Sequence, residues 1–545
     1  MKERIRQFLT ERGLDALLIT RTDSFLGEHY PPESGQFRQA TGFDGSAGIA
    51  VISATHAVLF VDSRYTEQAR LQSDFTVYEV PTQTTPSDWI QKNIPGAVIG
   101  YNPWQRPVAW VAYMLKKGIT LQEISPEDWG ILFPPAENTL APAFDYEKQY
   151  CGTDSDEKIK QVARHIREKG LDAFIFTTPD SVSYLLNRRS LTVPEYPVVF
   201  ERLIVRSDGT VCPLGTNLAD MAGTRIGMDL NETPQGLLTQ VQTVAQVISE
   251  PDVAAQMKAV KNKTEQENIR QACLFESAVL CRFLATIERQ KETLDEMACD
   301  TLLKQFRSEN PLYRGDSFDT IAAVGEHAAR AHYRADIMSN TPLTAAPMLL
   351  VDTGGNYLNG TTDMTRTICI GKPTTLMKKR YTQVLQGHIA LATTRLKSGD
   401  MPGILDERAR APLQADGADY GHATGHGIGL FLAVHEAPPV IYKTAQTPLT
   451  AGMVFSNEPA YYSPRAGFGI RLENMLMTVP GSEDTLILEN LLWVPFDGRL
   501  IQFNRLTDSE KAWLTAYHMG IREHIWPVLS QADRDTLKPL LDFFI

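Results

Sequence analysis

Two acidic residues belong to neighbouring predicted strands in the segment LLVDTGGNYLNGTTDMTRTICI. The apolar run 348–351 predicts a strand that ends at Asp352, and the Gly-Gly and Asn-Gly pairs after it indicate turns. In the next strand Asp363 shares a face with Thr365 and Thr367, because side chains alternate with a period of two. Two close carboxylates repel each other unless a cation neutralises them. A divalent-cation site and two solvated turn aspartates are both open interpretations of this segment alone.

Three histidines stand in the segment GHATGHGIGLFLAVHEAP, namely His422, His426 and His435. Four glycines between positions 421 and 429 disfavour a regular helix, so the two histidines four residues apart do not form a helical zinc motif, and HExxH is absent. Glycines also let backbone approach a ligand closely. A single buried histidine is usually a core residue, but this density indicates a site.

Two glutamates follow in the segments MVFSNEPAYY and FGIRLENM. The run 453–455 predicts a strand that leads to Glu458, and Pro459 ends it. In the second segment Arg471 and Glu473 share one face of a strand. A surface glutamate would be the ordinary interpretation. Here each glutamate is embedded in an apolar strand, which predicts burial, and a buried carboxylate needs a partner.

Together the three segments offer four carboxylates and one imidazole: Asp352, Asp363, His426, Glu458 and Glu473. Such an oxygen-rich set favours manganese, cobalt or iron over a thiolate zinc site. Four carboxylates carry more negative charge than one divalent ion neutralises, so two ions fit better. Two ions about 3.5–4 Å apart can hold a hydroxide and polarise a carbonyl together.

The elements before these motifs contain an internal repeat. Residues 11–24 (ERGLDALLITRTDS) and 168–181 (EKGLDAFIFTTPDS) share eight identities in fourteen positions at an offset of 157. Residues 98–102 and 225–229 are a second, weaker pair. Each copy joins a helix to a buried strand, so two tandem α/β domains are expected before an α+β region. The predicted domains are residues 1–145, 146–255 and 256–545.

The bulk composition is that of a globular chain with several cores. Its 545 residues exceed one domain, and the net charge of −12 does not favour nucleic-acid binding. The six cysteines contain no C-x-x-C spacing, which predicts reduced thiols and a cytoplasmic location. The N-terminus predicts an amphipathic helix, not a signal peptide, and no run reaches the ~18 apolar residues of a membrane span.

The motifs resemble those of the pita-bread metallopeptidases, which include methionine aminopeptidase, prolidase and aminopeptidase P. NGTTDMTRT, GHATGHGIG, VHE and FGIRLEN carry the resemblance, and FDGSAG (43–48) and VDSRY (61–65) extend it to the first domain. The long three-domain cytosolic aminopeptidases P are the most similar group. The resemblance implies two tandem creatinase-N-terminal-like α/β domains before a pita-bread catalytic domain. The variants Ala423, Asn457 and Ala460 depart from the family pattern without removing a ligand.

Roles for single residues follow from the resemblance alone. Asp363 and Glu473 would bridge two divalent ions, with Asp352 on one ion and His426 and Glu458 on the other. The ions would be manganese, with cobalt, iron or zinc as alternatives. Glu458 would also be the general base, and His332 and His435 would hold the scissile carbonyl. His422, Arg471 and Arg64 would bind substrate.

The implied reaction is release of the first residue from peptides with proline second, by a homodimer that associates through the catalytic domain. Two other functions stay open. One is a prolidase confined to Xaa-Pro dipeptides, and the other is a non-catalytic protein-binding or peptide-binding role on the same fold. A metal-free creatinase-like hydrolase is disfavoured because all five ligands are present. The sequence identifies neither the preferred first residue nor the physiological peptide.

Overall fold

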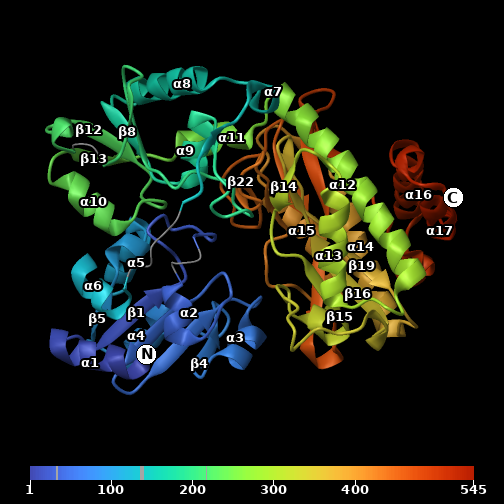
Figure 1. The fold of residues 1–545 in the computed structure, drawn as a ribbon, viewed down its shortest axis with the longest axis horizontal. Helices are drawn as coiled ribbons and strands as arrows, with labels where there is room; N and C mark the ends of the chain where they lie inside the picture. The colour runs from blue at the N-terminus through green and yellow to red at the C-terminus, as the bar shows by residue number, and fades with distance from the viewer. Residues whose placement is uncertain (32–34, 135–139, 216–217, 545) are drawn as a thin grey trace. The chain divides into compact units, whose positions relative to one another are not determined.

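The structure, a computed structural model, describes residues 1–31, 35–134, 140–215 and 218–544 (Figure 1). The chain forms two compact units. The first contains residues 1–146, 153–193 and 197–255, and the second contains residues 147–152, 194–196 and 256–545. Among the described residues, no helix is long and apolar enough to cross a membrane.

The first unit begins with a six-stranded sheet in the order β4-β3-β2-β1-β5-β6. Alternate residues of its central strand enter separate apolar clusters, Leu17 and Ile19 on one face and Ala16 and Leu18 on the other. Both faces are therefore covered, as the continuous apolar run of the strand requires. The strands are β1 (Ala16–Thr20), β2 (Ile49–Ser53), β3 (Ala57–Val61), β4 (Thr76–Glu79), β5 (Val98–Tyr101) and β6 (Thr120–Glu123). The helices are α1 (Lys2–Arg12), α2 (Gln36–Thr41), α3 (Thr66–Gln72), α4 (Pro86–Asn93), α5 (Val108–Lys116) and α6 (Pro126–Leu132).

A second sheet in the same unit repeats this topology in the order β11-β10-β8-β12-β13. Its central strand pairs antiparallel with β10 and parallel with β12, as β1 pairs with β2 and β5. The strands are β8 (Ala173–Phe176), β10 (Leu203–Arg206), β11 (Val211–Pro213), β12 (Arg225–Met228) and β13 (Gln246–Ser249). The helices are α8 (Ser155–Glu168), α9 (Pro179–Leu186), α10 (Gln235–Gln242) and α11 (Val253–Ala259). The predicted tandem of similar α/β domains is confirmed.

The repeat extends to single side-chain contacts. Gly100 pairs with Leu17 and Gly227 pairs with Phe174, the same position in each copy. A Cβ on Gly100 would lie 2.8 Å from Leu14 Cδ1, and a Cβ on Gly227 would lie 2.8 Å from Leu171 Cδ1. Both leucines come from the repeated Gly-Leu-Asp-Ala motif. Each motif leucine therefore packs where a side chain on the parallel strand is excluded.

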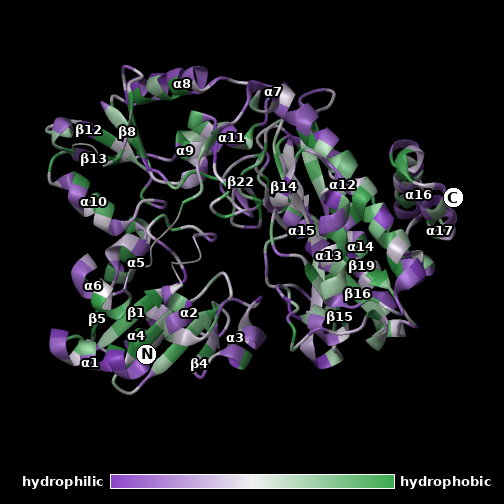
Figure 2. Ribbon diagram, viewed as in Figure 1, coloured by the Kyte–Doolittle hydropathy of each residue, from purple (hydrophilic) through white to green (hydrophobic). Residues whose placement is uncertain are grey.

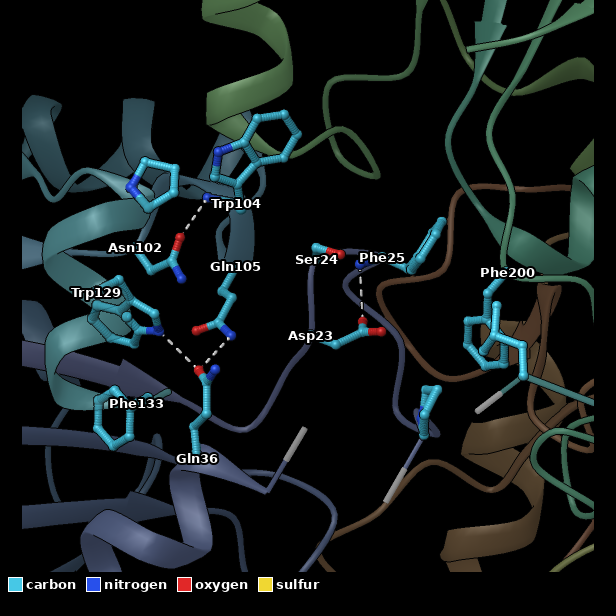
Figure 3. A pocket seen from close by; sticks show the side chains of 14 residues that line it. Asp23, Ser24, Phe25, Gln36, Asn102, Trp104, Gln105, Trp129, Phe133 and Phe200 are labelled. Atoms are coloured by element: carbon cyan, nitrogen blue, oxygen red, sulfur yellow. Dashed lines mark hydrogen bonds between the residues drawn. The ribbon is translucent and has the colours of Figure 1, made fainter. Parts of the chain in front are cut away.

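A cavity of about 490 Å³ lies inside the first unit (Figure 3). Its wall is mainly apolar, and hydrogen bonds hold some of its polar side chains. Gln36 Oε1 accepts from Trp129 Nε1 at 2.8 Å and from Gln105 Nε2 at 3.0 Å. Asp23 accepts from the backbone of Phe25 at 2.9 Å, and burial raises its pKa to about 6. Phe200, which follows the second repeat motif, completes the wall, so both α/β halves line this cavity.

The second unit is α+β. Its six-stranded sheet has the order β20-β27-β26-β23-β21-β22, and a three-stranded sheet has the order β15-β16-β19. The strands are β14 (Tyr313–Asp316), β15 (Ile321–Val324), β16 (Met348–Thr353), β17 (Gly355–Tyr357), β18 (Gly360–Thr361), β19 (Met364–Cys369), β20 (Leu396–Lys397), β21 (Gly425–Gly427), β22 (Glu436–Ile441), β23 (Val454–Asn457), β24 (Ala460–Ser463), β25 (Phe468–Arg471), β26 (Asn474–Pro480) and β27 (Thr485–Asn490). The helices are α12 (Lys263–Gln290), α13 (Glu296–Arg307), α14 (Thr375–Ala392), α15 (Gly403–Gln414), α16 (Asp508–His524) and α17 (Gln531–Asp542), with the short α7 (Lys148–Cys151).

The long helix α12 begins the part of the second unit that follows α11. Asn262 caps it, accepting from the amides of Thr264 and Glu265, and the Glu265 side chain accepts from the Asn262 amide in return. Ile269, Cys273 and Leu280 are buried on one side, and Figure 2 shows polar and apolar turns alternating along the helix. Apolar residues of this charged helix recur at spacings of three and four, which places them on a buried side of the helix.

The predicted pairing of the strands that carry Asp352 and Asp363 is also found. β16 and β19 are antiparallel, with Asp352 opposite Thr365. The connection between them is not a simple hairpin turn, because β17 pairs with both β14 and β18 in a separate sheet. The alternation of side chains along one strand does not show which strands pair with it, so the sequence does not predict this second sheet.

We expect Gly100→Ala and Gly227→Ala to destabilise the first unit by about 1–3 kcal/mol each, because the new methyl group overpacks the motif leucine. The melting temperature of that unit should fall by roughly 2–10 °C in a thermal scan. Gly130→Ala in α6 is the matched control, since nothing lies within 4 Å of its Cβ position. Equal melting temperatures for all three variants would contradict the packing argument.

Candidate metal centre

The first two predicted ligands come from β16 and β19. Asp352 is 8 % exposed and Asp363 is 4 % exposed, so both carboxylates are withdrawn from bulk water. Asp363 directly precedes Met364, which pairs with Thr353. The antiparallel register therefore brings the end of one strand beside the start of the other, as the motif predicts.

His426 lies on β21, between β22 and β23. Its Nδ1 is 2.9 Å from the carbonyl oxygen of Gly427, so the Nδ1–H donates and Nε2 is the ring nitrogen left to face the carboxylates. Nε2 lies 3.4 Å from Asp363 Oδ2 and 3.4 Å from Glu458 Oε1. A histidine with one nitrogen bonded to a carbonyl and the other facing carboxylates has the orientation of a metal ligand.

The two glutamates are held by backbone and hydroxyl groups. The Glu458 amide donates to Thr424 O at 2.9 Å, which ties the end of β23 to the histidine loop. The Glu473 amide donates to Thr365 O at 3.0 Å, and the Thr365 hydroxyl donates to Glu473 Oε2 at 2.7 Å. Thr365 therefore links the strand of Asp363 to Glu473.

The residues fit a divalent cation. Ligand atoms of Asp363, His426 and Glu473 lie within 4.8 Å of one another. Asp352 Oδ1 and Glu473 Oε1 are buried without a hydrogen-bond partner among the described residues. A buried carboxylate oxygen without a donor is costly, and coordination to a cation would satisfy it. The donor set is one imidazole and carboxylates, which suits a hard or borderline metal ion.

The pKa shifts of the clustered groups also favour a bound cation. Burial, reinforced by Asp363 and Glu458, raises the pKa of Glu473 well above its usual range. Burial also raises the pKa of Asp352 against the opposing charge of Arg471. For His426, burial favours the neutral ring, but the Asp363 hydrogen bond and the charge of Glu458 outweigh it and raise the pKa to about 9. Without a metal ion the cluster therefore retains protons.

A chain of hydrogen bonds runs from Asp352 to His422. Arg471 donates to Asp352 Oδ2 and to the Tyr462 hydroxyl, and its Nε donates to Thr365 at 3.1 Å. His422 Nδ1 lies 2.7 Å from Ala423 O, so its Nε2 accepts from Tyr462 at 3.0 Å. The sequence reasoning missed Tyr462. Tyr462 lies two residues after Ala460, the partner of Arg471 across β24 and β25, and the sequence alone does not show this pairing.

Helix α15 holds the glycine-rich loop that carries His422 and His426. Arg410 donates to the carbonyl oxygens of Tyr420 at 2.7 Å and His422 at 2.6 Å. Asp406 accepts from Arg410 Nε at 2.7 Å and from the Thr424 hydroxyl at 2.6 Å. A loop too rich in glycine to order itself is thus ordered by a buried ion pair.

The remaining predicted residues lie at different places. The rings of His435 and His426 have centroids 4.5 Å apart in an edge-to-face arrangement, so His435 adjoins the cluster. His332 lies half-buried in the loop between β15 and β16 of the same unit. Arg64 belongs to the first unit, where its Nε donates to Asp62 Oδ1 at 2.8 Å.

The fold and the site together define a buried cluster of carboxylates and one histidine that can hold a metal ion, in an α+β unit that follows a duplicated α/β pair. Residues 267–479 match metallopeptidase family M24, and residues 484–540 match the C-terminal region of that family. Residues 2–127 and 134–214 each match a creatinase/prolidase N-terminal domain. The chain belongs to metallopeptidase family M24.

Relatives over the full length refine this assignment. The chain is 31 % identical to a probable Xaa-Pro aminopeptidase P of Laccaria bicolor, over 96 % of this chain and 90 % of that protein. It is 30 % identical to human Xaa-Pro aminopeptidase 2, over 97 % of this chain and 85 % of that protein. A crystal structure of X-prolyl aminopeptidase from Caenorhabditis elegans aligns with a TM-score of 0.91 at 26 % identity, over 100 % of this chain and 98 % of the nematode chain. The predicted resemblance and fold class are confirmed.

We expect the chelator-treated protein to lose thermal stability as pH rises from about 6 to about 9. A group whose pKa is higher in the folded than in the unfolded protein stabilises the fold below its unfolded pKa, and this stabilisation is lost as pH rises through the folded pKa. For His426 the window runs from 6.5 to about 9, and the raised pKa of Glu473 acts in the same direction.

Differential scanning fluorimetry with and without added manganese measures this effect. Manganese should raise the melting temperature more at the alkaline end, because metal binding needs deprotonated ligands. Glu473→Gln should flatten the pH slope of the chelated protein. A chelated wild-type protein that becomes more stable over this range would contradict the assignment of the cluster.

Proposed function

We propose that this protein is a metal-dependent Xaa-Pro aminopeptidase, which releases the first residue of peptides that have proline second. The observation that carries the proposal is the match to the nematode X-prolyl aminopeptidase over 100 % of the chain, with the metal-centre residues gathered in one place. A non-catalytic role on the same fold is disfavoured, because no ligand of the set is replaced.

A prolidase function has less support. The prolidase of Thermococcus sibiricus matches only 63 % of this chain, at 22 % identity and a TM-score of 0.52, which is a likeness of fold alone. A site that accepts only dipeptides would also leave the second α/β domain without a role in substrate binding. The duplicated first unit therefore favours a substrate longer than a dipeptide.

Five residues would hold the metal ions: Asp352, Asp363, His426, Glu458 and Glu473. We propose two divalent cations, with manganese preferred because oxygen ligands dominate the set. The nematode enzyme is described as having a di-nuclear active site, which supports this number. When bound, such ions lower the pKa of a shared water and polarise the scissile carbonyl.

Glu458 is the proposed general base. The Ser456 hydroxyl donates to its Oε1 at 3.2 Å, and its Oε2 lies 3.8 Å from His422 Nδ1. The carboxylate would take a proton from the attacking water and pass it to the proline nitrogen as the C–N bond breaks. That proton is required because the proline nitrogen leaves as an amine.

The histidines and the Tyr462–Arg471 pair would position the substrate. His435 and His332 would donate to the carbonyl oxygen as negative charge develops on it. Arg471, fixed between Asp352 and Tyr462, would keep Asp352 deprotonated and oriented. His422 would border the substrate site, and Arg64 would contribute from the first unit.

Three further expectations complete the proposal. The enzyme would act in the cytosol, as the nematode relative is described, and would form a homodimer through the catalytic domain, which sedimentation would check. The domains would be residues 1–145, 146–255 and 256–545, which limited proteolysis would check.

The defining experiment compares hydrolysis of Arg-Pro-Pro and Arg-Pro by protein that has been chelated and then reloaded with manganese. Metal-dependent release of arginine from the tripeptide supports the aminopeptidase. Cleavage of the dipeptide alone identifies a prolidase. Cleavage of neither peptide by metal-loaded protein would overturn proline-specific hydrolysis.

We expect His435→Asn to lower kcat on Arg-Pro-Pro by about 10²- to 10³-fold, because one donor to the developing oxyanion is lost. KM and bound manganese should change little, since His435 is not among the proposed ligands. His56→Asn in the first unit is the matched control. Loss of manganese from His435→Asn would instead assign His435 to the metal.

A further inference from the structure

A buried carboxylate stands directly behind the exposed histidine of the proposed site. Glu436 is 2 % exposed, whereas its neighbour His435 is exposed. His435 lies in the bend that directly precedes β22, so its position is tied to that of Glu436. Glu436 is the first residue of β22 and pairs with Gly427, beside His426 on β21. The direction of His435 therefore depends on how Glu436 is held.

Two buried lysines hold Glu436. Lys261 Nζ donates to Glu436 Oε1, and Lys258 Nζ lies 3.3 Å from Oε2. Each lysine is 3 % exposed. The ammonium group of Lys261 also donates to the carbonyl oxygen of Lys258 at 2.6 Å, which locks the two lysines together. The result is a triad of two cations and one anion away from water.

Lys258 lies in the last turn of α11, and Lys261 lies in the segment that leads on to α12, where the chain enters the second unit. In that segment the Lys261 amide donates to Gly452 O at 2.9 Å, and Val260 forms a bridge with Met453. Met453 precedes β23, the strand that leads to Glu458. The segment therefore contacts both strands that lead to proposed catalytic side chains, β22 through Glu436 and β23 through its backbone.

Stability alone does not explain this arrangement. Burying three charges carries a large desolvation penalty, and apolar side chains of similar volume are often as stable or more stable. An ion triad does supply fixed direction, because each carboxylate oxygen faces one ammonium group. A displacement of about 1 Å at a catalytic group can cost a hundredfold in rate.

We propose that Lys258, Lys261 and Glu436 are positioning residues that aim His435 at the substrate carbonyl, so that the entry segment of the second unit is part of the catalytic machinery. This inference rests on the proposed peptidase function. It assigns no contact between the triad and the substrate, because all three residues of the triad are buried.

The test is the apolar triple variant Lys258→Met, Lys261→Met and Glu436→Met, which removes every charge of the triad at once. Since no buried charge is left unpaired, we expect it to fold with a melting temperature close to that of the wild type. Its kcat on Arg-Pro-Pro should fall about 10- to 100-fold, with KM and bound manganese nearly unchanged. Amide hydrogen exchange in residues 425–441 should rise.

Lys261→Met alone is the second variant, in case the triple variant does not fold. It leaves Lys258 and Glu436 as one pair of opposite charges, and we expect a smaller fall in kcat than in the triple variant. The matched control is Arg282→Met with Glu309→Met, which removes the more exposed pair between α12 and the end of α13, 2.7 Å apart, and should leave kcat unchanged.

Wild-type kcat in either folded variant would overturn the proposal, as would a fall in kcat fully explained by lost manganese. The exchange measurement separates this inference from the proposed function. If the wild type cleaves no peptide, peptidase action fails, while exchange at 425–441 still reports whether the triad holds the strand. Unchanged exchange in the triple variant would then overturn the positioning role.

Discussion

Mutual repulsion among buried acids is the constraint on which the second unit depends. Ligand atoms of Asp363, His426 and Glu473 lie within 4.8 Å of one another, and Asp352 and Glu458 adjoin them. At an effective dielectric near 20, two unit charges at that distance repel by roughly 3–4 kcal/mol. Groups that repel this strongly stay together only on rigid supports, and each of them lies on a strand or directly beside one.

Buried cations offset part of this charge. Arg471 pairs with Asp352. Arg366 is 2 % exposed and forms no ion pair among the described residues; it donates to the carbonyl oxygens of Thr365 and Glu473. Its other donors reach Asn474, Val494 and the Tyr517 hydroxyl in α16. Neutral acceptors from the C-terminal region thus hold the Arg366 guanidinium on β19 against the backbone of Glu473.

The sequence predicted those features of the fold and the site that depend on a single strand. Acidic residues at strand ends follow from apolar runs, and the repeat follows from identity at a constant offset. The single strand expected to carry both Arg471 and Glu473 was wrong, because β25 ends at Arg471 and β26 begins at Asn474. Tyr462 and Glu436 were missed because their roles depend on partners that are distant in sequence or in another strand, His422 for one and Lys261 for the other. The separate sheet of β17 and β18 was missed for the same reason, since its third strand lies about 40 residues earlier.

The missed residues are polar because each holds a neighbouring group in a fixed direction. Tyr462 accepts from Arg471 and donates to His422, and Glu436 lies between two lysines. Within the acidic cluster itself, Arg471 opposes the charge of Asp352, and His426 opposes the charge of Glu458. Apolar side chains could pack the space around these groups, but hydrogen bonds and ion pairs also fix orientation. The polar groups buried around the cluster are therefore best understood as supports of orientation, and only secondarily as packing.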